Sequence, residues 1–271
     1  MSPKKMPRLH LFEIEDFPWY PAVIREGQTD FLRFMMQTFD VFRAVIPHLR
    51  EAQQKSDRHH LVDFCSGGGG SMLLIRKHLK QDSKTPFRAT LSDLYPNIKA
   101  FEYVQKASNG DIDFKTTPVD AANPPADTPQ GFWTIFNGFH HFRPAQAQQI
   151  LATAVERKTP IGIFEPIDKS LFQIIINTIV LLVLMLVLTP FVRPFKWSRL
   201  LFTYLVPVIP LCTIWDGFVS VLRLYTPKDL RQMVSAIPET EAYEWKIGKA
   251  RHMFGTVIYL IGYSKPAKLP M

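Results

Sequence analysis

This chain has little cysteine and no long apolar run near its N-terminus. Its 271 residues include two cysteines, Cys65 in a glycine-rich stretch and Cys212 in an apolar run. They give no disulfide framework and suit a reducing compartment. The N-terminal stretch MSPKKMPRLHLFEIED carries basic residues without an apolar core and turns acidic by Glu13. A cleavable secretory signal is therefore not expected.

The chain also lacks a block of clustered basic residues, although its formal net charge is +8. A positive balance of this size indicates binding to nucleic acid, binding to an anionic membrane surface, or simply a solvated basic exterior. Because the basic residues are scattered, we expect no nucleic-acid partner. No internal repeat is present, and 271 residues favour one large domain with an insertion over two small domains.

From residue 61 onward, short β-branched or apolar runs alternate with stretches of helical spacing. This alternation is typical of βαβ units and predicts an α/β fold with a mostly parallel sheet. The predicted strands are 60–65, 88–93, 113–120, 131–138, 160–166, 243–250 and 255–264. The predicted helices of this part are 71–81, 97–108, 144–157 and 226–236.

The N-terminal part has an aromatic and apolar stripe at helical spacing. The stripe predicts one or two amphipathic helices that end near Pro47, and it consists of Phe31, Leu32, Met35, Phe39, Phe42 and Ile46. Such a stripe usually packs into a core. Trp19, Tyr20 and Arg25 are candidates to line a ligand pocket as well.

The stretch LVDFCSGGGGSMLLI runs from a buried-strand pattern through four glycines into a helical pattern. These flanks exclude a flexible linker. Glycines at such a turn let the backbone pass close to a ligand at the carboxyl end of the strand. A nicotinamide dinucleotide fingerprint needs G-x-G-x-x-G; Gly67 and Gly69 supply the first two glycines, but the third position is Met72.

The segment VDFCSGGGG resembles the first motif of class I S-adenosylmethionine-dependent methyltransferases. In that motif an acid begins a glycine-rich turn of the form D-x-G-x-G-x-G. Asp63 matches the acid, and Gly67 and Gly69 match the second and third glycines. Cys65 stands where the first glycine is usual. The resemblance covers about residues 55–167 and the last two strands. It implies a Rossmann-like, doubly wound sheet with an antiparallel final strand, and S-adenosylmethionine as the cofactor.

The resemblance continues at the ends of the next strands. Asp93 stands where the family places an acid that binds the ribose hydroxyls of the cofactor, and Asp120 where it places a residue near the adenine amino group. Asn137 begins NGFHH, which resembles the segment beside the methionine end and the methyl group. His140 and His141 are candidates for a catalytic base. No metal site is expected, because no cysteine or carboxylate ligands accompany the histidines at recognisable spacing.

An uncharged run from Leu171 to Val192 follows the fifth predicted strand. It is long enough to cross a hydrocarbon core, and a buried helix that is apolar on all sides would be rare in so small a domain. We therefore expect membrane contact. A second uncharged run, Leu200 to Trp215, is shorter and contains Pro207, so it is a poor span by itself.

The strands before and after this insertion must lie on one side of a membrane if they form one sheet. Two full spans would place Arg193, Lys196 and Arg199 on the far side, against the usual preference for basic loops in the cytoplasm. We therefore favour an interfacial or re-entrant helical hairpin, with these cations at the headgroups and the catalytic domain on the cytoplasmic side. Gln173 and Asn177 would face protein or headgroups.

The predicted function is a membrane-associated methyltransferase that uses S-adenosylmethionine and acts on a lipophilic small molecule or lipid. Two alternatives stay open: a non-catalytic membrane-bound scaffold of this fold, and a nicotinamide-dependent oxidoreductase. The predicted parts are an N-terminal helical cap (1–55), a cofactor-binding α/β core (56–167), an apolar insertion (168–225), and a C-terminal helix with the last two strands (226–271).

Overall fold

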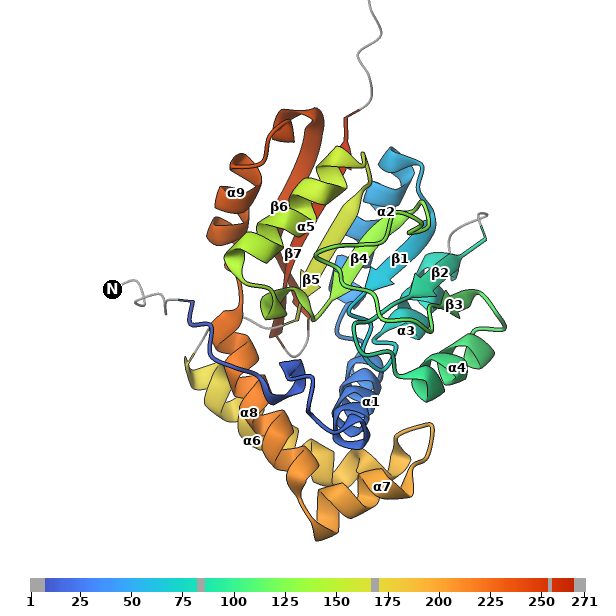
Figure 1. The fold of residues 1–271 in the computed structure, drawn as a ribbon, viewed down its shortest axis with the longest axis vertical. Helices are drawn as coiled ribbons and strands as arrows, with labels where there is room; N and C mark the ends of the chain where they lie inside the picture. The colour runs from blue at the N-terminus through green and yellow to red at the C-terminus, as the bar shows by residue number, and fades with distance from the viewer. Residues whose placement is uncertain (1–7, 82–85, 167–170, 253–254, 266–271) are drawn as a thin grey trace, which may run out of the picture.

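The computed structural model describes residues 8–81, 86–166, 171–252 and 255–265, except for the side chains of residues 171–177. Within these residues, one seven-stranded sheet has the order β3-β2-β1-β4-β5-β7-β6 (Figure 1). Its strands are β1 His60–Phe64, β2 Arg88–Leu91, β3 Ile112–Phe114, β4 Phe132–Phe136, β5 Ile161–Glu165, β6 Tyr243–His252 and β7 Gly255–Ser264. Strands β1 to β5 are parallel, and β7 runs antiparallel to β5 and β6. The predicted Rossmann-like sheet with an antiparallel end is confirmed.

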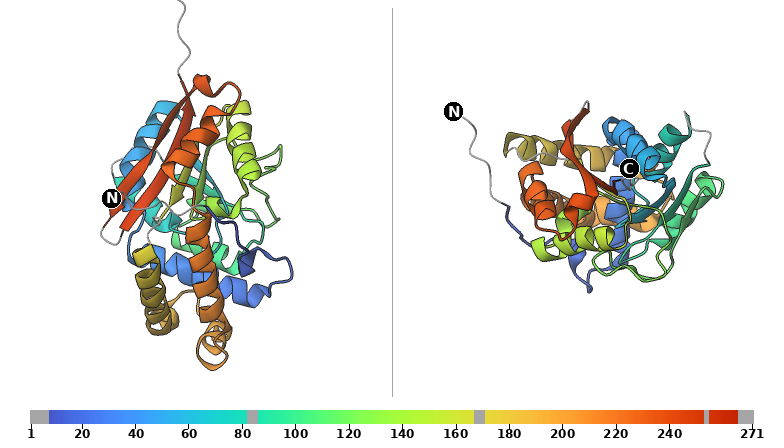
Figure 2. Two further views of the ribbon diagram at one scale, coloured as in Figure 1. Left: turned by 90° about the vertical axis from the view of Figure 1, so that its left-hand side faces the viewer. Right: turned by 90° about the horizontal axis from the view of Figure 1, so that it is seen from above.

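Helices cover both faces of the sheet, so the core has three layers (Figure 2). Apolar side chains of α2, α3 and α4 pack on one face, and those of α5 and α9 pack on the other. The helices are α1 Ala22–Thr38, α2 Ile46–Ser56, α3 Met72–Gln81, α4 Ile98–Ala107, α5 Pro144–Glu156, α6 Leu171–Leu188, α7 Trp197–Leu200, α8 Val208–Arg223 and α9 Pro227–Ser235. Because β1 pairs with β2 on one side and β4 on the other, the chain leaves a crevice at their carboxyl ends.

Two boundaries differ from the sequence-based expectation. The N-terminal helical stretch does not end near Pro47; α1 ends at Thr38, and Pro47 lies in the first turn of α2. Proline is well tolerated there, because the N–H that it lacks has no partner in a first turn. The third strand ends at Phe114 rather than continuing to residue 120. Pro118 has no N–H to donate to a ladder, which favours a loop.

The insertion between β5 and α9 shares a core with the N-terminal part. Helices α6 and α8 lie side by side beyond the carboxyl ends of the parallel strands, next to α1 (Figures 1 and 2). Ile24 and Phe31 of α1 pack with Met185 of α6 and with Ile209 of α8. The insertion is therefore built into the wall of the crevice.

The cations of the insertion do not all lie where we expected them. The buried carboxylate of Asp30 pairs with Arg199 at 2.7 Å and with Lys196 at 3.0 Å. These two side chains tie the insertion to α1, so the expectation that they lie at headgroups is wrong for both. Arg193 is exposed.

Among the described helices, none is by itself long and apolar enough to span a bilayer. The segments Trp197–Leu205 and Val208–Arg223 reach that length and composition only as a pair, with a bend of 80° between them. The expected placements of the Gln173 and Asn177 side chains, and the expected boundary between residues 167 and 168, lie outside the described residues.

Candidate active site

Asp63 anchors the glycine turn from behind. It lies near the end of β1, is buried, and accepts hydrogen bonds from the hydroxyls of Ser66 and Thr134, both at 2.7 Å. Burial raises the pKa of Asp63 to about 7, although these two hydrogen bonds act in the opposite direction. Asp63 therefore joins the turn to β4.

This raised pKa predicts a pH-dependent loss of stability. The folded state holds the Asp63 proton up to about pH 7, whereas the unfolded state releases it near its ordinary pKa of 3.8. The free energy of unfolding should therefore fall between these values by about 4 kcal/mol through this group. Urea unfolding at pH 4.5 and pH 7.5 should show a smaller fall for Asp63→Asn than for the native chain. Equal falls would contradict the assignment.

The glycine turn follows, with several residues in the left-handed region of backbone conformation. Gly67 has φ 53° and Gly69 has φ 92°, and a Cβ on Gly69 would lie 2.7 Å from Val104. Cys65 has φ 55°, a conformation that favours glycine. This explains why a glycine is usual at that position of the motif that the segment resembles.

A cavity of about 450 Å³ lies at the carboxyl ends of β1, β2 and β4, and we call it the strand-end cavity. Asp93 borders it, with Oδ2 accepting the Gly67 N–H at 2.7 Å and Oδ1 accepting the Tyr95 N–H at 2.8 Å. Because each carboxylate oxygen has two lone pairs, both can accept a further bond from a ligand. Asp120 borders the same cavity.

Most of the predicted cofactor residues line this cavity. They are Cys65, Gly67, Asp93, Asp120 and Asn137, whereas Asp63 and Gly69 support the turn from outside it. Arg25, a candidate from the N-terminal segment, also lines it, with its guanidinium 3.9 Å from the centre of the Tyr95 ring.

A second cavity of about 440 Å³ lies between α1, α6 and α8, and we call it the apolar cavity. Apolar side chains make up most of its surface, and polar or charged side chains from the N-terminal segment, α1, α6, α8 and the NGFHH segment also line it. Representative apolar residues are Met35 of α1, Leu181 and Leu184 of α6, and Ile214 and Val221 of α8. The two cavities share the residues Glu15, Leu32, Met36 and Asn137, so they meet beside the NGFHH segment.

His140 lies at this junction and is held by Glu165 at the end of β5. The backbone N–H groups of Phe139 and His140 donate to one oxygen of Glu165, at 2.7 and 3.1 Å. The other oxygen lies 2.9 Å from His140 Nδ1. When the His140 ring is neutral, this contact favours the tautomer that carries its proton on Nδ1. The lone pair of Nε2 is then available to accept a proton. His140 lines the apolar cavity.

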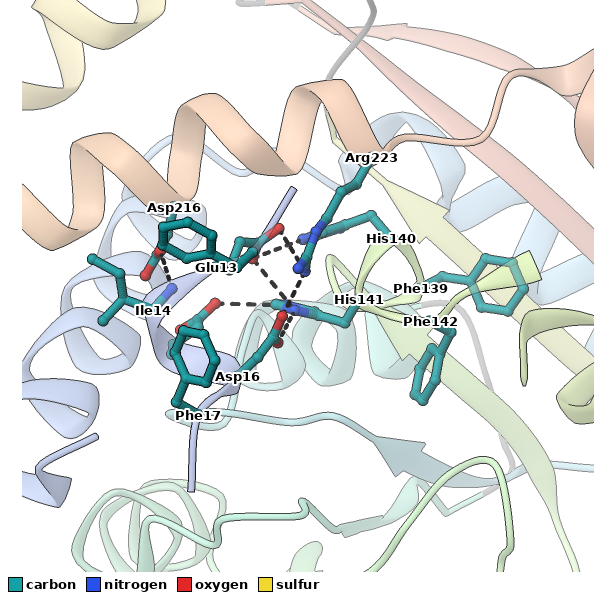
Figure 3. Close-up of polar contacts among 12 residues, drawn as sticks. Glu13, Ile14, Asp16, Phe17, Phe139, His140, His141, Phe142, Asp216 and Arg223 are labelled. Carbon is teal, nitrogen blue, oxygen red and sulfur yellow. Dashed lines mark hydrogen bonds and ion pairs between the residues drawn. The ribbon is translucent and has the colours of Figure 1, made fainter. Parts of the chain in front are cut away.

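His141 lines the strand-end cavity. Carboxylates of the N-terminal segment surround its ring (Figure 3). Its Nδ1 lies 2.8 Å from Asp16 Oδ1 and 3.3 Å from Glu13 Oε2. Burial alone would lower the pKa of His141, but the carboxylates of Glu13, Asp16 and Glu15 together hold it well above its ordinary value. His141 is therefore a cation at neutral pH and cannot accept a proton.

Arg223, at the end of α8, completes a network of charges around these histidines (Figure 3). Its Nη1 lies 3.1 Å from Glu13 and 2.7 Å from Asp16. Sequence reasoning missed Glu13, Asp16 and Arg223, because they come from opposite ends of the chain and no local motif joins them.

One group among the described residues has the spacing of a metal site. The ligand atoms of Glu13, His140 and His141 all lie within 4.8 Å of one another. Arg223 and the protonated His141 already place positive charge against these carboxylates. The contacts present are those of an ion-pair network, and the absence of a metal stays a prediction.

Comparison with known proteins identifies the fold. No protein-family model matches the chain, and no curated protein matches it. The plantazolicin methyltransferase BpumL, solved with SAH (S-adenosylhomocysteine), is similar in structure with a TM-score of 0.52 and 13% identity, over 90% of this chain and 96% of that one.

Two further solved structures are similar at lower TM-scores. An O-methyltransferase family protein from Burkholderia thailandensis has a TM-score of 0.47 and 13% identity over 87% of this chain and 60% of that one. Magnesium protoporphyrin IX methyltransferase from Synechocystis PCC 6803, with bound SAH, has a TM-score of 0.46 and 13% identity over 92% and 89%. By its strand order and its likeness to BpumL, the chain has the Rossmann-like methyltransferase fold.

Proposed function

We propose that this chain is an S-adenosylmethionine-dependent methyltransferase that acts on a lipophilic small molecule or lipid. The observation that carries the proposal is the meeting of two cavities beside His140, one polar at the strand ends and one apolar between α1, α6 and α8. A methyl donor and an apolar acceptor need such adjoining sites, because the reacting atoms must lie in line.

The strand-end cavity has the groups that the cofactor requires. The Asp93 carboxylate is available to the two ribose hydroxyls, and the glycine turn allows close approach of the backbone. Asp120, on the same wall, would accept from the adenine amino group. The fold shared with BpumL, a methyltransferase solved with SAH, supports the same cofactor here.

His140 would remove the proton of the acceptor. When bound, the cofactor supplies an activated methyl group on a sulfonium. As the acceptor heteroatom takes the methyl group, the proton that it carries would pass to the lone pair of His140 Nε2. Glu165 holds the ring and stabilises the imidazolium that forms.

Association with a membrane surface is supported by the exposed apolar side chains of the insertion. Trp197 is 77% exposed and Leu205 is 78% exposed. Others on the same segments are Ile179, Val183, Leu186, Val187, Phe191, Phe195, Leu201, Tyr204, Val206 and Leu211. Val180 both lines the apolar cavity and is 46% exposed, so an acceptor would enter from this side. A lipid-facing entrance suits a lipophilic substrate.

Vesicle binding tests this surface. The double variant Trp197→Glu and Leu205→Glu should weaken co-sedimentation with phosphatidylcholine vesicles by roughly a thousandfold, because each side chain loses about 2 kcal/mol of apolar transfer. The double variant Gln149→Glu and Gln232→Glu, which adds the same two negative charges at exposed positions of α5 and α9, is the matched control and should bind as the native chain does. Equal binding by the double variant would contradict the proposed contact.

The proposed cofactor is tested by calorimetric titration of the full chain with SAH and, separately, with NAD⁺. We expect a saturable heat with SAH and none with NAD⁺, since Met72 occupies the third dinucleotide glycine position and is buried at the start of α3. Binding of NAD⁺ in place of SAH would instead favour an oxidoreductase.

A further inference from the structure

Two buried polar groups on the wall of the apolar cavity have no hydrogen-bond partner. The Glu13 side chain is 1% exposed, and neither of its oxygens accepts a hydrogen bond from any residue that the structure describes. The Thr213 hydroxyl of α8 is likewise unpartnered within the described part of the chain, at 3% exposure. Such groups are rare in folded proteins and costly, so they point to a missing partner.

The neighbours of Glu13 balance its charge without satisfying its oxygens. Arg223 Nη1 lies 3.1 Å from Oε1, and His141 Nδ1 lies 3.3 Å from Oε2, but neither contact has the geometry of a hydrogen bond. A carboxylate oxygen can only accept. The partner that Glu13 lacks is therefore a hydrogen-bond donor that reaches it from the cavity.

The charges on the cavity wall exclude one class of ligand. Among the described residues that line the apolar cavity there is no lysine or arginine, whereas Glu13, Glu15 and Asp216 all border it. Burial raises the pKa of Glu15 to about 8, so this group is largely uncharged at neutral pH. An anionic group placed at this end would still meet the carboxylates of Glu13 and Asp216, with no lysine or arginine on the wall to pair with, at a cost that a low-dielectric site increases. Much of the remaining wall is apolar, with Leu181, Leu184 and Val221 among its residues, and suits a hydrocarbon or aromatic body.

We propose that the apolar cavity selects an amphiphile whose polar end is a hydroxyl or an amine, held by Glu13 and Thr213, and rejects carboxylates and phosphates. That this amphiphile is the methyl acceptor rests on the proposed function. Its selection by the cavity does not, because binding precedes any transfer.

Three probes with the same alkyl chain test the selection: octan-1-ol, octylamine and octanoate. Each is titrated into the full chain, with SAH present and without it. We expect octan-1-ol and octylamine to bind roughly tenfold or more tightly than octanoate, because only these two donate to Glu13. Octanoate binding as tightly as octan-1-ol would overturn the inference. If SAH did not bind, that result would count against the proposed function. The relative affinities of the three probes would still test the selection by the cavity.

A pair of isosteric variants gives a second, independent readout. Thr213→Val should weaken octan-1-ol binding by about fivefold, the loss of one neutral hydrogen bond. Thr203→Val is the matched control, since the Thr203 hydroxyl is also buried and unpartnered among the described residues but does not line the cavity. It should leave probe binding unchanged. Equal effects of the two variants would show that Thr213 does not contact the ligand.

Glu13→Gln tests the carboxylate itself. The variant keeps the size of the side chain, removes its charge and adds a donor, so the preference for octylamine over octanoate should fall by roughly tenfold. Because Glu13 also pairs with Arg223, folding of this variant is checked by circular dichroism. If it does not fold, the ranking of the probes and the Thr213→Val comparison decide the matter.

Discussion

Asp93→Ala is expected to abolish measurable SAH binding. The carboxylate would lose two charge-assisted hydrogen bonds to the ribose, worth about 3 to 6 kcal/mol together, or roughly a hundredfold to ten-thousandfold in affinity. The same change removes the acceptor for the Gly67 and Tyr95 N–H groups, which loosens the turn and adds to the loss. Calorimetric titration of the purified variant measures the effect.

The control for Asp93→Ala is Asp127→Ala, an exposed acid whose only ion pair is with Lys115 at 3.9 Å among the described contacts. It should bind SAH as the native chain does. A circular dichroism spectrum like that of the native chain shows that the Asp93 variant is folded. Native affinity in a folded Asp93→Ala variant would remove the strand-end cavity as the cofactor site.

His140→Ala should lower the methyl-transfer rate by roughly 10²- to 10⁴-fold without weakening SAH binding. The ring is the proposed base and lines the apolar cavity, not the strand-end cavity, so its loss should affect chemistry and spare the cofactor. The measurement is transfer of labelled methyl from S-adenosylmethionine into a lipid extract, beside a calorimetric titration with SAH.

His140→Gln separates a catalytic role from a structural one. A glutamine amide can still donate to Glu165 but cannot accept a proton at neutral pH, so this variant should fold normally and stay as slow as His140→Ala. Recovery of the native rate in His140→Gln would mean that His140 only positions its neighbours. His141, held as a cation by three carboxylates, is not expected to be the base.

The core of the fold and the residues of the strand-end cavity that follow the strands were predictable from local sequence. A buried strand followed at once by glycines or an acid places those residues at the carboxyl edge of a parallel sheet. Gly67 and Asp93 follow this rule, and the structure brings both to one cavity. Asp120 borders the same cavity, although it stands in the loop after β3, which ends at Phe114. Asn137 reaches the same cavity after β4, again as the first residue beyond a buried strand.

The rest of the site depends on contacts that no local pattern encodes. Glu13 pairs with Arg223 at the end of α8, more than two hundred positions away in the sequence. Glu13 also contacts His141 and favours the protonated form of its ring. The hydropathy pattern likewise did not predict that Arg199 pairs with the buried Asp30. The local sequence of a cation between two apolar runs is the same whether the cation lies at lipid headgroups or pairs with a carboxylate on another helix.

Incubating the purified full chain with a lipid extract and S-adenosylmethionine that carries a labelled methyl group, followed by mass spectrometry of the organic phase, tests the proposed methyl transfer most directly. We expect a product heavier than its precursor by one labelled methyl group, formed by the native chain and lost in His140→Ala. A native chain that binds SAH but transfers no label to any lipophilic component would contradict the proposed transfer and would favour a non-catalytic scaffold of the same fold.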